Sequence, residues 1–218
     1  MSNWRLLLSR TVTGLEQLKQ QGRAVPEWVL GGGTALMLHA NHRLSKDIDA
    51  FIDDPQYLGM MSPKVTEVWG CRAWDETAHY LKLKYAEGEI DFIVSGPLFG
   101  LGTDTYEIDL TDLPAARKVS IQVEPPAEIA LKKMHYRPTM LKPRDIFDIA
   151  VADSIDHDAL VRNMSTLSDK KSALNERLDN VDRKFLQAEL AELDIQAGWD
   201  VQKKNCLDTT RSLIRQIP

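Results

Sequence analysis

The sequence predicts an α+β fold, with strands and helices up to residue 124 and a helical region over residues 125–218. Alternation of apolar and polar residues, the pattern of a half-buried strand, occurs at several places before residue 124. From about residue 156 onward the pattern is helical and charged, without alternation. No linker rich in glycine or serine separates the two regions, so we expect the helical region to pack on the α/β core.

Composition describes a protein with one sizeable core. The chain has 218 residues, of which 43% are hydrophobic, enough for one domain with an appended subdomain. The net charge of −5 argues against a globally basic nucleic-acid binder but not against a local basic patch. Cys71 and Cys206 lie in no metal-ligand spacing and are typical of reduced thiols. We find no signal-peptide core or membrane span at the N-terminus, and expect a cytoplasmic protein.

Apolar spacing sets the elements of the first half of the chain. Apolar residues three and four apart predict an amphipathic helix over residues 3–22. The segment 27–32 is a short apolar strand that runs into glycines, and we expect a helix over 34–42 that stops near Asn41. Alternation around Ile48 then predicts a strand over 47–52.

A helical and loop-like stretch over 54–70 separates that strand from a predicted hairpin. Glu87 and Gly88 supply the turn between two alternating segments. Strands are expected over four segments: 80–85, 89–94, 106–110 and 119–123.

Prolines introduce the helices of the second half. Pro125 and Pro126 precede a helix over 127–137, and Pro143 opens another over 144–155, because proline is tolerated in the first helical turn. Leucines at helical intervals continue this pattern over residues 169–193.

Three glycines, Gly31, Gly32 and Gly33, stand between the predicted strand and helix. Glycine lets the backbone approach a ligand closely and adopt positive φ, and a helix N-terminus presents free N–H groups that suit a phosphate. The alternative is an ordinary tight turn with Thr34 as the helix cap. The spacing matches neither a Walker A loop nor a dinucleotide-binding fingerprint.

Asp47 and Asp49 follow on the next predicted strand, with Ile48 between them. Residues i and i+2 of a strand share a face, which places the two about 6 to 7 Å apart along the chain. Their charges repel unless a cation intervenes, and carboxylate oxygen is the ligand that hard divalent cations prefer. The alternative is a solvated edge strand.

Asp91 adds a third carboxylate. It lies among apolar residues of a predicted strand, where an aspartate is costly to bury without a partner. Three carboxylates carried by strands are compatible with a two-metal site, which stabilises the attacking and leaving oxygens of phosphoryl-type transfer.

These motifs occur together in a known order. Gly-Gly, a short helix, Asp-x-Asp on a strand and a later aspartate resemble the DNA polymerase β-like nucleotidyltransferase superfamily. The segments "GGTAL", "HRLSKDIDAF" and "KPRDIFDI" further resemble the AbiEii/AbiGii-type nucleotidyltransferase toxin family over residues 28–152. The resemblance implies a nucleotidyltransferase-fold mixed β-sheet with flanking helices, followed by a C-terminal helical bundle.

The resemblance also implies roles for the carboxylates and the glycines. Asp47 and Asp49 are the predicted catalytic carboxylates and, with Asp91, the predicted ligands of one or two Mg²⁺ ions. Three residues of the turn are predicted to hold the triphosphate of an NTP: Gly32, Gly33 and Thr34.

Further predicted site residues flank this stretch or lie beyond it. The resemblance places Arg43 and Ser45 among the nucleotide-binding residues. It places Lys133 on the departing pyrophosphate, with Lys132 as its competitor, and Asp145 as a catalytic residue that positions the lysine or an incoming hydroxyl. Each also has a structural interpretation: Arg43 as a surface residue, the lysines as a solvated helix face, and Asp145 as a complement to the helix dipole.

The function that follows is Mg²⁺-dependent transfer of a nucleoside monophosphate from an NTP to an acceptor hydroxyl on RNA, tRNA or protein. The resemblance suggests the toxin of a bacterial toxin–antitoxin or phage-defence system, with a cognate antitoxin as partner. The basic residues within 135–144 would face a nucleotide or an RNA backbone, or be solvated. Two other functions stay open: a non-catalytic nucleotide- or metal-binding module, and a metal-dependent phosphoesterase.

Overall fold

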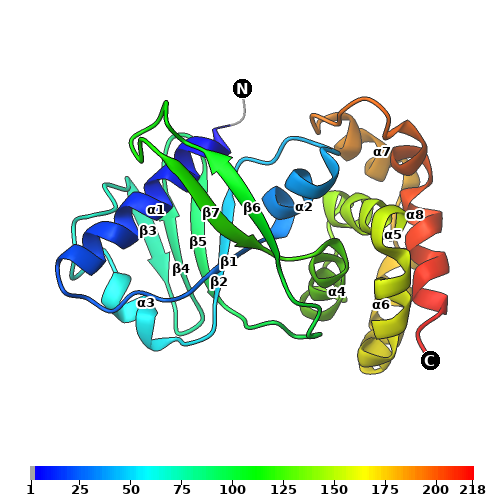
Figure 1. The fold of residues 1–218 in the computed structure, drawn as a ribbon. Coiled ribbons are helices and arrows are strands. Elements are labelled where there is room, and N and C mark those ends of the chain that lie inside the picture. Colours follow the sequence, from blue (N-terminus) through cyan, green and yellow to red (C-terminus); the bar gives the residue numbers. More distant parts are fainter. Residues whose placement is uncertain (1–2) are drawn as a thin grey trace. The chain divides into compact units, whose positions relative to one another are not determined.

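A computed structural model describes residues 3–218 (Figure 1). Its contacts divide the chain into two units. The sheet unit comprises the chain up to Thr34 together with Ser45–Gly96 and Thr103–Glu124, and the helical unit comprises Ala35–Leu44, Pro97–Gly102 and Pro125–Pro218. The predicted division after residue 124 therefore coincides with one boundary, while residues 35–44 and 97–102 are grouped with the C-terminal helices.

The sheet unit contains one mixed sheet of seven strands in the order β3-β4-β5-β2-β1-β7-β6. The strands are β1 (Val29–Gly31), β2 (Ile48–Ile52), β3 (Ala73–Glu76), β4 (Tyr80–Lys84), β5 (Glu89–Val94), β6 (Asp104–Asp109) and β7 (Lys118–Val123). The pairs β2/β5 and β1/β7 are parallel, and the other pairs are antiparallel. Strand β5 pairs in parallel with β2 on one side and forms an antiparallel hairpin with the preceding strand β4 on the other.

Helix α1 (Trp4–Gln20) packs on β2 and β5 (Figure 1). Its buried leucines lie three and four residues apart: Leu7, Leu8, Leu15 and Leu18. In β2 the buried residues alternate with the half-buried Asp49 and Phe51. This alternation leaves Asp49 on the side of the strand that is not filled by the apolar core.

The predicted strands and helices of this half are confirmed, with shifted ends and one addition. Helix α2 (Gly32–Ala40) already begins at Gly32, and β2 begins at Ile48, so Asp47 lies just before the strand on which it was predicted. Strand β3 was not predicted, because its sequence AWDE has no apolar alternation and its residues are mostly exposed. It forms by antiparallel pairing with β4. A short helix, α3 (Gln56–Met61), lies in the stretch predicted to be helical and loop-like.

The helical unit consists mainly of the elements after residue 125. They are α4 (Pro126–Tyr136), α5 (Pro143–Asn163), η1 (Met164–Lys170), α6 (Lys171–Asp179), α7 (Arg183–Ala191) and α8 (Asp200–Arg215). Helix α5 packs against α4 and α8, and Pro126 and Pro143 stand in first helical turns as predicted. Among the described residues, no helix has the length and apolarity to cross a membrane.

Candidate active site

The glycine turn joins β1 to helix α2 (Gly32–Ala40). Gly32 has a φ of +63°, and a Cβ at this residue would collide with the Asp49 carboxylate. A Cβ at Gly31 would collide with the side chains of Phe51 and Glu124. Glycine is therefore required at Gly32 by two separate features, the left-handed backbone and the close approach of a carboxylate.

A comparison of Gly32→Ala with Gly22→Ala separates the effect of the left-handed backbone from that of the close Asp49 carboxylate. Gly22 also has positive φ (+75°), but no atom lies within 4 Å of the position that a Cβ would occupy there. We expect Gly22→Ala to lower the free energy of unfolding by about 1 kcal/mol through backbone strain alone, and Gly32→Ala by about 3 kcal/mol because the Asp49 side chain must also move. Denaturant unfolding measures both; equal losses would contradict the proposed collision.

Thr34 ties the start of α2 to the segment before β2. Its side chain is buried, and its hydroxyl donates a hydrogen bond to the carbonyl oxygen of Asp47 at 2.5 Å. Ser45 is half-buried in the same segment. The nucleotide-binding roles of Gly32, Gly33, Thr34 and Ser45 stay predictions, and the contact that the structure gives Thr34 is one that positions Asp47.

Asp49 and Asp91 lie side by side on adjacent strands. The parallel register of β2 and β5 aligns Asp49 with Asp91, and neighbouring strands are about 4.8 Å apart. Aligned residues in a parallel pair point to the same face. Asp47 lies one residue before β2, and its Oδ1 accepts a hydrogen bond from the Glu89 backbone N–H at 3.0 Å.

A lysine that was not predicted to belong to the site contacts Asp91. Lys82 on β4 is the register partner of Asp91, and its Nζ lies 2.7 Å from Asp91 Oδ2 and 2.6 Å from Glu89 Oε2. The other oxygen of Asp91, Oδ1, is buried and accepts no hydrogen bond from any described residue. Burial, together with the nearby charge of Asp49, raises the pKa of Asp91 to about 6 against the opposing effect of Lys82.

The carboxylates of Asp47, Asp49 and Asp91 have the chemistry that a divalent cation requires, although their side chains are not arranged as a metal site. Carboxylate oxygens are hard ligands, and the buried Oδ1 of Asp91 is left for a cation to satisfy. Across residues 3–218, no three His, Cys, Asp or Glu side chains are arranged closely enough to hold a metal ion. Asp47, Asp49 and Asp91 as Mg²⁺ ligands therefore stay a prediction.

The second group of predicted residues is centred on Asp148 in the helical unit. Arg43 donates from Nε to Asp148 Oδ1 and from Nη2 to Oδ2, both at 2.8 Å. Lys133 Nζ lies 3.1 Å from Oδ2 of the same carboxylate. Burial would raise the pKa of Asp148, but Arg43 and Lys133 hold it well below its ordinary value. Asp148 is thus an ionised, fully buried carboxylate.

His42 completes the shell around Asp148. Its Nε2 lies 3.0 Å from Asp148 Oδ1, and its buried Nδ1 has no hydrogen-bond partner among the described residues. A protonated imidazole would leave an unsatisfied buried N–H at Nδ1, whereas a neutral ring leaves only a lone pair. Burial accordingly lowers the pKa of His42 in spite of Asp148. We infer a neutral ring that donates from Nε2.

Arg43 was predicted to bind the nucleotide, and this assignment stays a prediction. The side chain is only 6% exposed, and its guanidinium forms the two-point contact with Asp148. The observed geometry gives Arg43 a part in fixing α5 to the segment 42–44, because Asp148 belongs to that helix.

Lys133 and Asp145 contact each other. Lys133 Nζ lies 2.7 Å from Asp145 Oδ1, and Arg137 Nη1 lies 3.2 Å from Asp145 Oδ2. Asp145 Oδ2 also accepts the Lys142 backbone N–H at 3.1 Å, so Asp145 caps the start of α5. Burial would raise the pKa of Asp145, and Lys133 and Arg137 lower it overall. Lys132 points elsewhere, 4.0 Å from Glu128.

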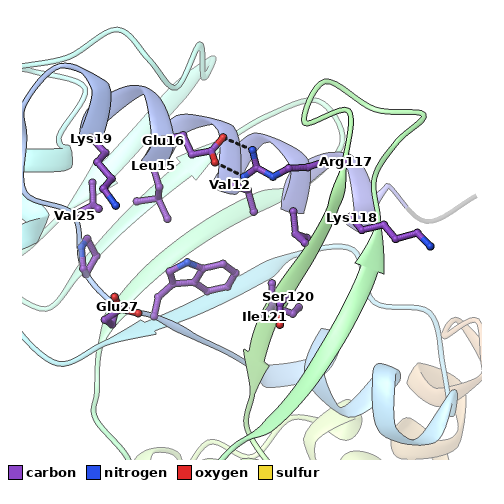
Figure 2. A pocket seen from close by; sticks show the side chains of 13 residues that line it. Val12, Leu15, Glu16, Lys19, Val25, Glu27, Arg117, Lys118, Ser120 and Ile121 are labelled. Carbon is purple, nitrogen blue, oxygen red and sulfur yellow. Dashed lines mark hydrogen bonds and ion pairs between the residues drawn. The ribbon is translucent and has the colours of Figure 1, made fainter.

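A separate hollow in the sheet unit contains none of the predicted site residues. It has a volume of about 330 Å³ and lies between α1, residues 25–28 and β7 (Figure 2). Val12 and Leu15 line it from α1, and an ion pair between Glu16 and Arg117, at 2.9 Å, lies along it. This hollow is not the candidate active site.

Residues 17–216 match the family described as "Nucleotidyl transferase AbiEii toxin, Type IV TA system". Because the match covers most of the sequence, the chain belongs to this family and is a nucleotidyltransferase.

One solved structure that is similar to this chain is a "putative nucleotidyltransferase from H. pylori". The two sequences are 13% identical, the TM-score is 0.45, and the alignment covers 97% of this chain and 96% of that one. No curated protein matches the chain.

Proposed function

We propose that the protein transfers a nucleoside monophosphate from an NTP to an acceptor hydroxyl on RNA or protein, and that it depends on Mg²⁺. The observation that carries this proposal is the alignment of Asp49 with Asp91 beside the Gly32 turn. The acceptor oxygen forms a bond to the α-phosphorus, and the bond from that phosphorus to the bridging oxygen breaks. Pyrophosphate departs, and the hydroxyl proton is released to solvent.

In this proposal the sheet unit supplies the carboxylates and the turn. Asp49 and Asp91, with Asp47, would hold Mg²⁺, which when bound polarises phosphate oxygens and lowers the pKa of the attacking hydroxyl. Gly32 and Gly33 would present backbone N–H groups to the triphosphate, as the N-terminus of a helix does for anions.

The proposal also gives roles to residues of the helical unit. Lys133 would offset the charge that develops on the departing pyrophosphate. Asp145 is a positioning residue for Lys133, because its Oδ1 lies 2.7 Å from Nζ. Asp148 and Arg43 hold the start of α5 in place through their buried two-point contact.

The family to which the chain belongs is described as a type IV toxin–antitoxin family. We propose accordingly that it is a toxin with a cognate antitoxin, and that it acts in the cytoplasm, where NTPs and acceptor RNA are present.

Incubation with each radiolabelled NTP, Mg²⁺ and total RNA or protein tests this proposal. We expect label on the acceptor, with pyrophosphate as the other product, and loss of label transfer in Asp47→Ala. Nucleotide binding without turnover would point to a non-catalytic module. Release of labelled nucleotide or phosphate without transfer would point to a phosphoesterase, and either result would overturn the proposed reaction.

A further inference from the structure

The ammonium group of Lys82 lies beside the carboxylates that we propose bind Mg²⁺. The antiparallel register of β4 and β5 places Lys82 opposite Asp91. Glu89 and Asp91 are two residues apart on β5 and share a face, and Lys82 Nζ contacts both, at 2.6 and 2.7 Å. The Lys82 side chain is only 26% exposed. The pairing of β4 with β5 therefore places the positive charge of Lys82 beside these carboxylates.

The position of Lys82 bears on how a metal ion would be held. A cation within a few ångströms of a carboxylate cancels much of the negative charge that would attract a free divalent ion. The triphosphate of an NTP carries the additional negative charge that restores this attraction. A metal ion and a nucleotide would then bind more strongly together than the metal alone.

We propose that Lys82 is an internal counter-ion that keeps free divalent cations weakly bound, so that the metal enters together with the NTP. The inference rests on the proposed function, since it takes Asp49 and Asp91 as metal ligands. Lys82 is a positioning residue here, because it touches a carboxylate and not the reacting atoms. Its removal makes the cluster of Asp91, Glu89 and Asp49 more negative by one charge.

The same strand supplies a matched control. Lys84 is two residues from Lys82 on β4 and forms an ion pair with Asp75 of β3. Lys84→Met therefore removes the same charge from the same strand and leaves the contact of Lys82 with Asp91 in place, although Lys84 lies opposite Glu89 in the β4/β5 register. Lys82→Arg keeps the charge beside Asp91, and Lys82→Gln is a second neutral variant that retains a hydrogen-bond donor.

Mn²⁺ titration followed by electron paramagnetic resonance tests the inference without measuring activity. We expect Lys82→Met and Lys82→Gln to bind Mn²⁺ alone at least about tenfold more tightly than the unmodified protein. A nonhydrolysable NTP should strengthen Mn²⁺ binding strongly in the unmodified protein and less in these variants. Lys82→Arg and Lys84→Met should behave as the unmodified protein does.

Two results overturn the inference in distinguishable ways. If the neutral variants are folded and bind free Mn²⁺ no more tightly, while Asp49→Asn still abolishes Mn²⁺ binding with the nucleotide, the counter-ion role is wrong and the metal site stands. If Asp49→Asn binds Mn²⁺ and nucleotide as the unmodified protein does, the metal site and the counter-ion role both fall.

Discussion

Asp49→Asn is expected to lower nucleotidyl transfer by at least about 100-fold, because a metal held by this carboxylate would contribute several kcal/mol of transition-state stabilisation. Asparagine has nearly the same size as aspartate, so the side chain can still lie over Gly32 as it does in the structure. The expected loss is therefore one of charge and metal ligation, not of packing. Label transfer from radiolabelled NTP to acceptor measures it.

The control for this variant lies at the end of the same strand. Asp53→Asn makes the same chemical change at an exposed residue just beyond β2, and we expect it to leave transfer unchanged. Unfolding by denaturant should show that Asp49→Asn is folded. Full activity in a folded Asp49→Asn protein would contradict the assignment of Asp49 to the active site.

The sequence predicts well those strands whose alternation of buried and exposed residues lies within one short segment. Strands β2, β4 and β5 each bury alternate residues, and this alternation is visible in the sequence. Strand β3 carries no such pattern, because it is an edge strand whose residues are mostly exposed. Its formation depends on the neighbouring strand β4, which no local window contains.

The contact between Lys82 and Asp91 could have been predicted from the sequence, although the two residues lie on different strands. The hairpin turn fixes the β4/β5 register, and Tyr85 N–H bonds to the Gly88 carbonyl at 2.9 Å. Counting outward from this pair aligns Lys82 with Asp91. The signal was thus present in the predicted hairpin, but it required the register in addition to the strand positions.

The partners of Arg43 could not be found in this way. Arg43 and Asp148 are 105 residues apart, and no turn or strand register links the segments that carry them. An arginine before an Asp-x-Asp strand is equally compatible with a phosphate, a solvent-exposed position or a buried carboxylate. Only the packing of α5 in the helical unit shows that Asp148 is its partner.

Asp148→Asn is expected to cause the largest loss of stability, about 3–5 kcal/mol in the free energy of unfolding, because it removes the carboxylate that balances a buried positive charge. The Arg43 side chain is 6% exposed and loses the carboxylate that accepts two of its N–H groups. Lys133 keeps Asp145 as a partner, so the loss falls mainly on Arg43. Asp179→Asn, at a side chain 77% exposed, is the matched control and should change stability little.

The same carboxylate predicts how stability depends on pH. The pKa of Asp148 in the folded protein lies well below its ordinary value of 3.8, so the unfolded chain binds its proton first as the pH falls. The stability that Asp148 contributes is therefore complete above about pH 3.8 and is lost as the pH falls through the lower, folded pKa. Asparagine does not titrate, so the unfolding free energy of Asp148→Asn should fall less steeply than that of the unmodified protein below pH 3.8. Equal slopes for the two proteins in this acid range would contradict an ionised, buried Asp148.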